Sequence, residues 1–271
     1  MLHKLLLFFL FLIPLNGLSS DYELHAIQSL LVISADPSEA QPTMDALAAI
    51  GLPAEYYCIG VSINAALNIA VLKSMVTGRN ILYVGSAGTL DGFTTPYITT
   101  PTSVYWMPEA QRVNIGDALM NLFPPLDSSA SYIAAALPKR ALLTSPTVSH
   151  IPDINISGLP DRSLLIENME GYYVVQALQQ AGAASIDVIM GITDTCGPDA
   201  YAQWVVNAPI VAQQTATYVS NFFKSLSSRR EPMFSPTGYR AVPVSVEGLN
   251  SLVPVETCFG RFCRAVREKF R

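Results

Sequence analysis

The hydrophobic and polar positions of the chain alternate between short apolar runs and longer stretches with helical spacing. The first short runs, Ser29–Ala35, Tyr56–Gly60 and Ile81–Val84, are bounded by turn residues, as strands buried on both faces of a parallel sheet usually are. The stretches between them, Glu39–Ile50 and Val61–Met75, have the spacing of helices with one apolar side. This β-α-β-α-β alternation predicts parallel strands joined by right-handed crossovers.

The middle of the chain is less regular. Thr, Tyr, Val and Trp alternate with Pro over Phe93–Met107, which predicts β structure with an edge strand. Two further strands are expected at Tyr132–Leu137 and Ala141–Ser145, and a loop containing Pro and Asp at His150–Asp161. A last long helix is expected at Tyr201–Phe223.

The stretch from Ile166 to Ala200 forms a compact unit of helix, turn, strand and loop. Asn168 can cap the helix, because its side-chain oxygen can accept from backbone N–H groups of the first turn. Glu170 falls in that turn, where the helix dipole favours a negative charge, and Gly182 ends the helix. The apolar run Ile186–Ile192 then predicts a fully buried strand.

Several reactive side chains fall next to the ends of these strands. Asp194 follows the last strand, Glu39 lies in the loop after the first, and Ser86 and Gly88 lie in the loop after the third. Ligands of open α/β sheets bind at the carboxyl ends of the strands, so these positions and Glu170 should converge. Carboxyl groups at two or three strand ends can activate a water and protonate a leaving group.

Each of these residues also has an ordinary structural explanation. Glu39 fits a surface helix, Glu170 a capping carboxylate and Asp194 the cap of the next helix. The sequence GSAG at 85–88 fits a tight turn, because neither a P-loop nor a G-x-G-x-x-G pattern is present.

Composition indicates a large folded core. Half of the 271 residues are hydrophobic and 14% are charged, which argues against disorder and allows one large α/β domain or two small ones. The net charge of −5 gives no sign of nucleic-acid binding. From Asn221 onward, nine Lys and Arg face four Asp and Glu, which fits a solvated surface helix or, alternatively, a surface for a membrane or a partner.

The first twenty residues have the pattern of a secretory signal. His3 and Lys4 precede the apolar stretch Leu5–Leu15, and small residues follow it up to Ser20. This predicts a periplasmic or secreted protein. A signal anchor and a misassigned start codon, which would leave the protein cytoplasmic, are the alternatives.

The cysteines give no metal-binding pattern, since there is no CxxC spacing and no Cys/His cluster. Cys58 fits a core thiol. Cys258 and Cys263 can form a disulfide only if a turn separates them.

Five short motifs, in order, resemble the nucleoside phosphorylase and nucleosidase superfamily. They are SADPSEA (34–40), IGVSINAA (59–66), VGSAGTL (84–90), ENMEG (167–171) and GITD (191–194). The chain looks most like the hydrolytic branch, the 5′-methylthioadenosine/S-adenosylhomocysteine nucleosidases and futalosine hydrolases. The resemblance implies a single-domain three-layer αβα sandwich with a central mixed, largely parallel sheet over 21–225. The signal at 1–20 precedes it. The composition of 226–271 predicts an irregular extension with a basic terminal helix, and neither segment is typical of the family.

The resemblance also implies the roles of two catalytic carboxyl groups. Glu39 matches the residue that orders and deprotonates the attacking water, and Asp194 matches the general acid at the purine N7. An N-glycosidic bond breaks through a cationic, oxocarbenium-like state, so a proton donor with a raised pKa suits Asp194.

The binding residues follow from the same motifs. Ser86, Ala87 and Gly88 match the glycine-rich segment beside the ribose and the water, Met169 matches the residue packed on the sugar, and Glu170 the residue that binds the ribose hydroxyls. The resemblance implies neither a cofactor nor a metal. It does imply that the protein forms a homodimer.

The identity of the substrate is suggested by two motifs. The carboxyl of Asp194 can donate to N7 and accept from a 6-amino group, which favours an adenine nucleoside. The ENMEG motif resembles futalosine hydrolases more closely. One substrate agrees with both the motif and Asp194, namely 6-amino-6-deoxyfutalosine, an intermediate of menaquinone biosynthesis. At position 190 the family often has an arginine, and this chain has Met190 instead. The loop 145–150 lies where the resemblance places the purine.

Two rival functions remain open at this stage. One is a purine nucleoside phosphorylase, against which the missing arginine argues. The other is an exported nucleoside-binding protein that lacks catalytic activity because Met190 replaces the arginine.

Overall fold

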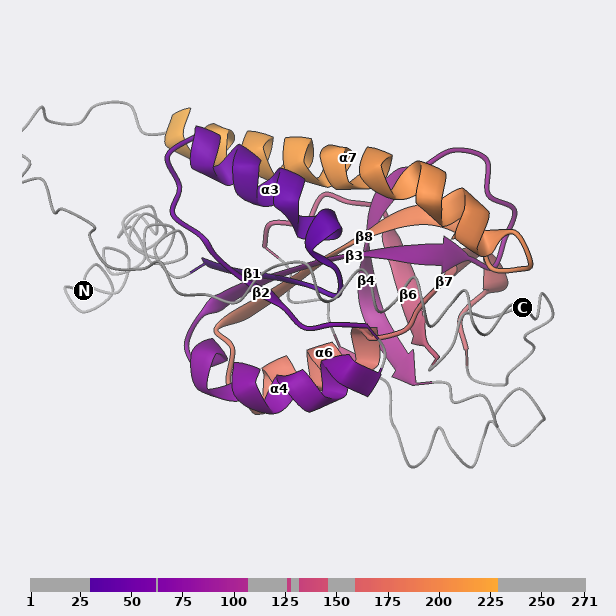
Figure 1. The fold of residues 1–271 in the computed structure, drawn as a ribbon, viewed down its shortest axis with the longest axis horizontal. Coiled ribbons are helices and arrows are strands. Elements are labelled where there is room, and N and C mark those ends of the chain that lie inside the picture. Colours follow the sequence, from indigo (N-terminus) through magenta and orange to yellow (C-terminus); the bar gives the residue numbers. More distant parts are fainter. Residues whose placement is uncertain (1–29, 62, 107–125, 128–131, 146–158, 229–271) are drawn as a thin grey trace, which may run out of the picture.

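The protein is an α/β structure in which one eight-stranded mixed sheet lies between two pairs of helices (Figure 1). The computed structural model describes residues 30–61, 63–106, 126–127, 132–145 and 159–228. Its strands are β1 (Leu30–Ser34), β2 (Glu55–Cys58), β3 (Asn80–Thr89), β4 (Tyr97–Trp106), β5 (Leu126–Asp127), β6 (Lys139–Thr144), β7 (Leu165–Asn168) and β8 (Ser185–Thr195). Its helices are α3 (Pro37–Ala49), α4 (Ile63–Val76), α6 (Gly171–Gln180) and α7 (Ala200–Ser228), with a 3-10 turn at Arg162–Leu164.

The first half of the sheet follows the predicted topology. β1 pairs in parallel with β2 and β3, and β3 pairs in parallel with β8. The second half closes on itself, because β8 also pairs with β4, β4 with β6, β6 with β7, and β7 with the last residues of β3. The mixed, largely parallel sheet predicted from the sequence is confirmed.

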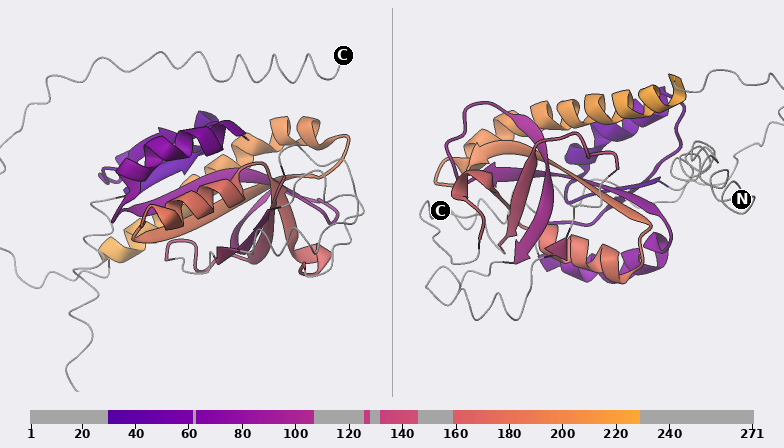
Figure 2. Two further views of the ribbon diagram at one scale, coloured as in Figure 1. Left: turned by 90° about the horizontal axis from the view of Figure 1, so that it is seen from below. Right: turned by 180° about the vertical axis from the view of Figure 1, so that it is seen from behind.

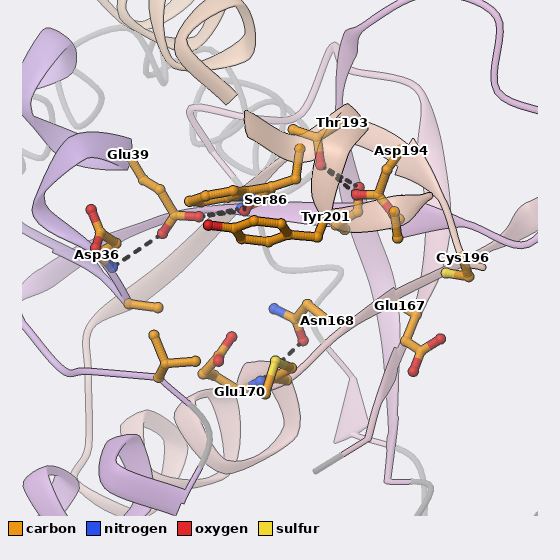
Figure 3. A pocket seen from close by; sticks show the side chains of 17 residues that line it. Asp36, Glu39, Ser86, Glu167, Asn168, Glu170, Thr193, Asp194, Cys196 and Tyr201 are labelled. Carbon is orange, nitrogen blue, oxygen red and sulfur yellow. Dashed lines mark hydrogen bonds between the residues drawn. The ribbon is translucent and has the colours of Figure 1, made fainter. Parts of the chain in front are cut away.

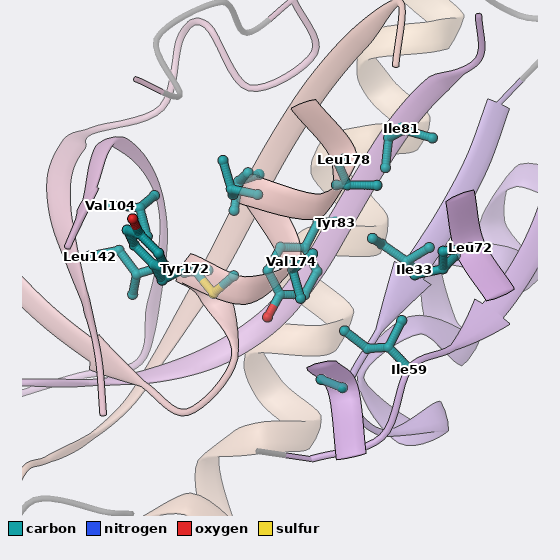
Figure 4. Packing of buried hydrophobic residues seen from close by; sticks show 14 of the residues in the cluster. Ile33, Ile59, Leu72, Ile81, Tyr83, Val104, Leu142, Tyr172, Val174 and Leu178 are labelled. Atoms are coloured by element: carbon teal, nitrogen blue, oxygen red, sulfur yellow. The ribbon is translucent and has the colours of Figure 1, made fainter. Parts of the chain in front are cut away.

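The continuous apolar runs arise because both faces of the sheet are covered. Leu30 and Val32 of β1 pack with α3 and α7, whereas Leu31 and Ile33 pack with α4 and α6 (Figure 4). Successive strand residues point to opposite faces, so a strand buried on both sides cannot contain polar alternation. The two helix pairs remain on opposite faces in the views from the front and from behind (Figures 1 and 2).

Two predicted loops are in fact the ends of long strands. The segment 85–88 was expected to be a loop, but it continues β3 to Thr89. Likewise, β8 runs to Thr195 and contains Asp194, which was expected just beyond the strand. The local signals for turns at these glycines are overridden because β3 and β8 pair with each other along their whole length.

The apolar run 132–137 was predicted to be a strand, and this was wrong. The segment forms consecutive turns. The carboxylate of Asp187, which is buried within β8, accepts from the backbone N–H groups of Tyr132 (2.8 Å) and Ala134 (2.9 Å). Because this carboxylate satisfies the donors of the turn, the segment needs no neighbouring strand.

The prediction of an edge strand in 93–107 was also wrong. The strand there is β4, which has partners on both sides. Pro101 is accommodated at an irregularity in the register with β6, between Pro101 and Ser103. A proline cannot donate to a ladder, and a bulge is one of the few places in a sheet where this is tolerated.

The remaining elements were predicted closely. The helix expected at 201–223 is α7, which ends at Ser228 and so passes the expected domain boundary. Cys58, expected in the core, is only half-buried. None of the helices in the described part of the chain is long and apolar enough to cross a membrane. The signal segment 1–20, the loop residues 146–158 and the terminal segment 229–271, with Cys258 and Cys263, lie outside the described residues.

Asn168 was predicted to cap α6 with Glu170 in the first turn, but the cap position is Glu170 and the helix begins at Gly171. The Asn168 side chain still accepts from the start of the helix, from two residues before the cap. Its Oδ1 accepts from the backbone N–H groups of Gly171 (2.9 Å) and Glu170 (3.3 Å), and its Nδ2 donates to the buried hydroxyl of Tyr83 (3.3 Å). This amide therefore joins the start of α6 to β3. Gly182, with φ +72°, ends the helix as expected.

We expect Asn168→Ala to lower the free energy of unfolding by about 2–3 kcal/mol, because it leaves buried N–H groups without an acceptor. Urea unfolding at neutral pH measures this. The matched control is Gln41→Ala, which removes an exposed amide that bonds Asp45 (2.8 Å) and should change stability by no more than about 0.5 kcal/mol. Equal stability of Asn168→Ala and the wild type would contradict the capping role.

Candidate active site

One pocket lies where the carboxyl ends of β1, β3, β7 and β8 meet the start of α7 (Figure 3). It contains all seven residues that the sequence predicts as site residues: Glu39, Ser86, Ala87, Gly88, Met169, Glu170 and Asp194. The other lining residues are Ala35, Asp36, Val61, Glu167, Asn168, Thr193, Cys196, Ala200, Tyr201 and Trp204. The convergence inferred from parallel strands therefore holds geometrically.

Glu39 lies in the first turn of α3 and not in a loop. Asp36 caps this helix through a capping box, in which the Asp36 N–H donates to Glu39 Oε2 at 3.3 Å. The other oxygen, Oε1, accepts from the Ser86 backbone N–H (2.9 Å) and from the Ser86 hydroxyl (2.5 Å). Burial raises the pKa of Glu39 to about 7, against these hydrogen bonds, which lower it.

A β-bulge directs Asp194 into the pocket. The β3–β8 register shifts between Ala87, which faces Ile192, and Gly88, which faces Asp194, so Thr193 is an extra residue. Gly88 is required at this point, because a Cβ there would lie 2.6 Å from Asp194 Oδ1 and 2.7 Å from Cys196 Sγ. The predicted glycine-rich loop is thus a strand whose glycine allows a carboxyl group to approach.

The carboxyl group of Asp194 is buried and has one close hydroxyl partner. Burial raises its pKa, and the hydrogen bond from the Thr193 hydroxyl (2.7 Å) lowers it. The same hydroxyl lies 3.4 Å from the Ala87 carbonyl, and it has one proton to donate. When Asp194 is protonated, the Thr193 hydroxyl can turn to that carbonyl and accept from the acid.

Glu170 and Met169 line the same pocket, on the turn that connects β7 with α6. Glu170 is 6% exposed and makes no side-chain cap to its own helix, although capping was its ordinary explanation. Its side chain instead lines the pocket, with Asn168 beside it (Figure 3).

A further group of polar side chains surrounds Glu167, next to Asp194. The Ser145 hydroxyl donates to the Glu167 carboxylate, and both residues are buried. Burial, followed by the charges of Glu167 and Asp194, raises the pKa of the Cys196 thiol. Cys196 is therefore held as a neutral thiol between two carboxyl groups.

The pocket is strongly acidic. Five carboxyl residues line it, Asp36, Glu39, Glu167, Glu170 and Asp194, and no Lys, Arg or His is among its described lining residues. Met190, at the position where the family resemblance suggested an arginine, is fully buried in the core on the side of α4 and α6 and does not line the pocket. Such a site favours neutral or cationic ligands and disfavours anions.

Sequence reasoning missed the aromatic wall of the pocket. Tyr201 and Trp204, one turn apart at the start of α7, stack with ring centroids 6.0 Å apart, and both line the cavity. Two aromatic residues in the first turns of the helix that follows GITD were a usable signal, because a helix that starts near a strand end faces the site. Among the described residues, no group of His, Cys, Asp and Glu is arranged to hold a metal ion.

No protein-family model and no curated protein sequence matches the chain. Solved structures do. A mutant of the Helicobacter pylori 5′-methylthioadenosine/S-adenosylhomocysteine nucleosidase with 5′-methylthioadenosine in its active site is 14% identical, with a TM-score of 0.54, over 73% of this chain and 99% of that chain.

Two more structures give the same picture. A futalosine hydrolase mutant of Helicobacter pylori is 13% identical (TM-score 0.57; 73% of this chain, 100% of that one). A Streptococcus pneumoniae nucleosidase of the same kind, in complex with 8-aminoadenine, is 15% identical (TM-score 0.57; 72% and 99%). At these identities the likeness establishes the fold, which is the fold that the resemblance predicted.

Glu39→Gln should stabilise the protein at alkaline pH. Because burial raises its pKa to about 7, folded Glu39 keeps a proton that the unfolded chain releases, so its contribution to folding falls as pH rises from about 4 to 7. We expect the variant to gain on the order of 1–3 kcal/mol in unfolding free energy at pH 8, and progressively less toward pH 4.

Urea unfolding across this pH range measures the difference. The control is Glu55→Gln, which removes an exposed carboxylate paired with Arg79 (2.8 Å) and should change stability by about 1 kcal/mol or less. A Glu39→Gln effect that does not vary with pH would contradict the raised pKa.

Proposed function

We propose that this protein is a nucleosidase that hydrolyses the N-glycosidic bond of 5′-substituted adenine nucleosides and releases adenine. The proposal is carried by one observation: Glu39 and Asp194, two carboxyl groups whose pKa burial raises, lie on opposite sides of one pocket, and Glu170 lines the same pocket (Figure 3). General acid–base chemistry near neutral pH needs such groups.

Each carboxyl group has a distinct task in this reaction. Protonated Asp194 donates to the purine N7, so that the base departs as a neutral molecule. Glu170 accepts hydrogen bonds from the ribose hydroxyls and places the sugar. Ionised Glu39 takes a proton from the water that attacks the anomeric carbon, and the acidic pocket stabilises the cationic sugar that forms as the bond breaks.

The charge of the pocket supports hydrolysis over phosphorolysis. A phosphorylase has to bind a phosphate dianion next to the sugar, and that requires cationic side chains or a well-developed array of donors. The described lining residues offer five carboxyl groups and no cation. Water, which is neutral, is the nucleophile that fits. No metal or cofactor takes part in the proposed reaction.

The proposed substrates carry an adenine base and a variable 5′ group. Asp194 suits adenine because its carboxyl can donate to N7 and accept from the 6-amino group. The names of the similar solved structures, nucleosidases of 5′-methylthioadenosine and S-adenosylhomocysteine and a futalosine hydrolase, suggest the candidates for the 5′ group. Together with the ENMEG motif, these names lead to a more specific proposal. The substrate is 6-amino-6-deoxyfutalosine, and the reaction is a step in menaquinone biosynthesis.

The second candidate is a nucleoside-binding protein without catalytic activity, and the expected reason for the missing activity was Met190. Since Met190 is buried in the core and does not line the pocket, its substitution for arginine leaves the described catalytic carboxyl groups in place. This weakens the second candidate.

We also propose a homodimer, exported if the 1–20 segment acts as a signal. The first turns of α7 expose the large apolar residues Tyr201, Val205, Val206 and Ile210, with 44–67% of each accessible. Tyr201 lines the pocket, so a second copy seated on these residues would lie at its rim.

Asp194→Asn tests the proposed reaction. The variant cannot protonate N7, and we expect kcat for adenine release from 5′-methylthioadenosine, S-adenosylhomocysteine or 6-amino-6-deoxyfutalosine to fall by about tenfold or more. Asp91→Asn, which alters an exposed carboxylate in the turn after β3, is the matched control and should keep wild-type activity.

Product analysis with and without phosphate separates the rivals. Adenine release that does not depend on phosphate supports the nucleosidase, and the fastest substrate identifies the 5′ group. Ribose 1-phosphate formation would establish a phosphorylase instead. Tight binding of adenine nucleosides without any product would establish a binding protein.

Val206→Asp tests the dimer. Val206 is 67% exposed and outside the pocket, so a charge there should abolish association without disturbing the fold. Sedimentation velocity at micromolar concentration should give a dimer for the wild type and for the control Val71→Asp, which alters an exposed valine of α4, and a monomer for Val206→Asp. A monomeric wild type would refute the proposal.

A further inference from the structure

The chain has two tryptophans, and one of them reaches into the pocket to contact a predicted site residue. Trp204 Nε1 lies 2.9 Å from the hydroxyl oxygen of Ser86, although the two residues are 118 positions apart. That hydroxyl in turn lies 2.5 Å from Glu39 Oε1. An unbroken chain of hydrogen bonds therefore runs from the indole to the carboxyl group.

The direction of this chain is fixed by the chemistry of its members. An indole N–H can only donate, so the Ser86 oxygen must accept from Trp204. A serine hydroxyl has a single proton, and with the indole bonded to its oxygen that proton is free to point to Glu39 Oε1. The Ser86 backbone N–H donates to the same carboxyl oxygen at 2.9 Å. Oε1 is thereby occupied by two donors from one residue.

The other carboxyl oxygen is left as the reactive one. Oε2 has one long contact, 3.3 Å from the Asp36 N–H, within the described part of the chain. A carboxylate offers about four acceptor positions, so Oε2 retains capacity to accept a proton.

Trp204 is held firmly enough to act in this way. Two residues of α7 near it, Gln203 one residue before and Asn207 three residues after, bond to the backbone of β8. Gln203 Oε1 accepts from the Thr195 N–H, and Asn207 Nδ2 donates to the Thr193 carbonyl, each at 2.8 Å. Tyr201 stacks on the indole with an interplanar angle of 20°. The start of α7 is thus attached to the strand that carries Asp194.

We propose that Trp204 is a positioning residue: its indole N–H fixes the Ser86 hydroxyl as a donor to Glu39 Oε1, which leaves Oε2 directed at the attacking water. The proposal deepens the proposed hydrolase function and rests on it for its kinetic consequences. The hydrogen-bond chain itself does not depend on which reaction the pocket performs.

The same chain tunes the ionisation of Glu39. Hydrogen bonds to the charged form lower the pKa of a carboxyl group, and a hydroxyl that itself accepts a bond is a stronger donor. Burial acts in the opposite direction. The titratable groups whose charges interact with Glu39 include Asp36, which caps α3, Tyr56 on β2 and Tyr83 on β3, and Glu170 and Tyr201 line the same pocket. Loss of the indole N–H should therefore raise the pKa of Glu39.

Trp204→Phe tests the kinetic consequence, because it keeps an aromatic ring at this position and removes the N–H together with one ring of the indole. We expect the acid limb of the kcat/KM profile to move up by about half a pH unit to one unit, the worth of one hydrogen bond. Adenine release should then fall about three- to tenfold at pH 6 and stay within about twofold of the wild type at pH 8.5.

The matched control is Trp106→Phe. Trp106 Nε1 also donates to a hydroxyl, that of Tyr173 at 2.8 Å, but it lies outside the pocket. This variant should leave the pH profile unchanged. If Trp204→Phe lowers kcat/KM by one factor at every pH, the indole merely packs and the proposal is overturned.

A spectroscopic experiment tests the chain without any substrate. In the Trp106→Phe protein, Trp204 is the sole tryptophan, so its emission reports on the partner of its N–H. We expect that emission to titrate with a midpoint near pH 7, and the transition to disappear when Glu39→Gln is added, because the amide does not ionise in this range. Retention of the transition in the double variant would assign it to another group and overturn the inference.

The two experiments distinguish failure of the inference from failure of the proposed function. A Glu39-dependent transition in a protein that releases no adenine would refute the nucleosidase and still support the coupling of Trp204 to Glu39. Adenine release with an unshifted profile in Trp204→Phe, and no Glu39-dependent transition, would refute the coupling alone.

Discussion

The parallel pairing of β3 with β8 is the constraint on which the other features of the structure depend. These two strands pair from Asn80 and Ser185 to Thr89 and Thr195, and their side chains contribute to the cores on both faces of the sheet. The same pairing carries the site, because Ser86 and Asp194 lie near its carboxyl end. The bulge at Thr193 interrupts the alternation of side chains between the two faces of the sheet. The side chain of Asp194 can therefore point into the pocket although the rest of the strand is mostly apolar.

The pocket combines charges that would be unfavourable in an ordinary core. Five carboxyl groups line one cavity whose described lining residues include no Lys, Arg or His, and burial raises the pKa of at least Glu39 and Asp194. Folding such a site costs free energy whenever the carboxyl groups ionise. A site of this kind is consistent with chemistry in which a proton is given at one end, a proton is taken at the other, and positive charge develops between them.

The donors around Glu39 and Asp194 come from distant parts of the chain. Ser86 of β3 holds Glu39 of α3, and Trp204 of α7 holds Ser86. Thr193 holds Asp194, while Gln203 and Asn207 fasten the start of α7 to the same strand. The two carboxyl groups are consequently parts of one hydrogen-bonded framework, and the first turns of α7 serve as the wall that connects them.

The sequence by itself determined the layered α/β architecture, because buried strands and half-buried helices differ in their apolar periods. It also determined that Glu39, Ser86, Gly88, Glu170 and Asp194 meet, since the carboxyl ends of neighbouring parallel strands lie at one edge of a sheet. The hydrogen bond from the start of α6 to the Asn168 side chain could be predicted too, because it joins residues close in sequence, although the helix begins later than expected.

Only the tertiary structure decided the features that depend on non-local partners. The glycines at 85 and 88 signal a turn locally, yet the pairing with β8 keeps them in a strand. The apolar run 132–137 favours a strand, yet the carboxylate of Asp187, more than fifty residues away, holds it as turns. Trp204 becomes part of the site only because folding brings its indole within 2.9 Å of Ser86. A periodic pattern records which side of an element is buried, but it does not record which distant atom occupies a given hydrogen bond.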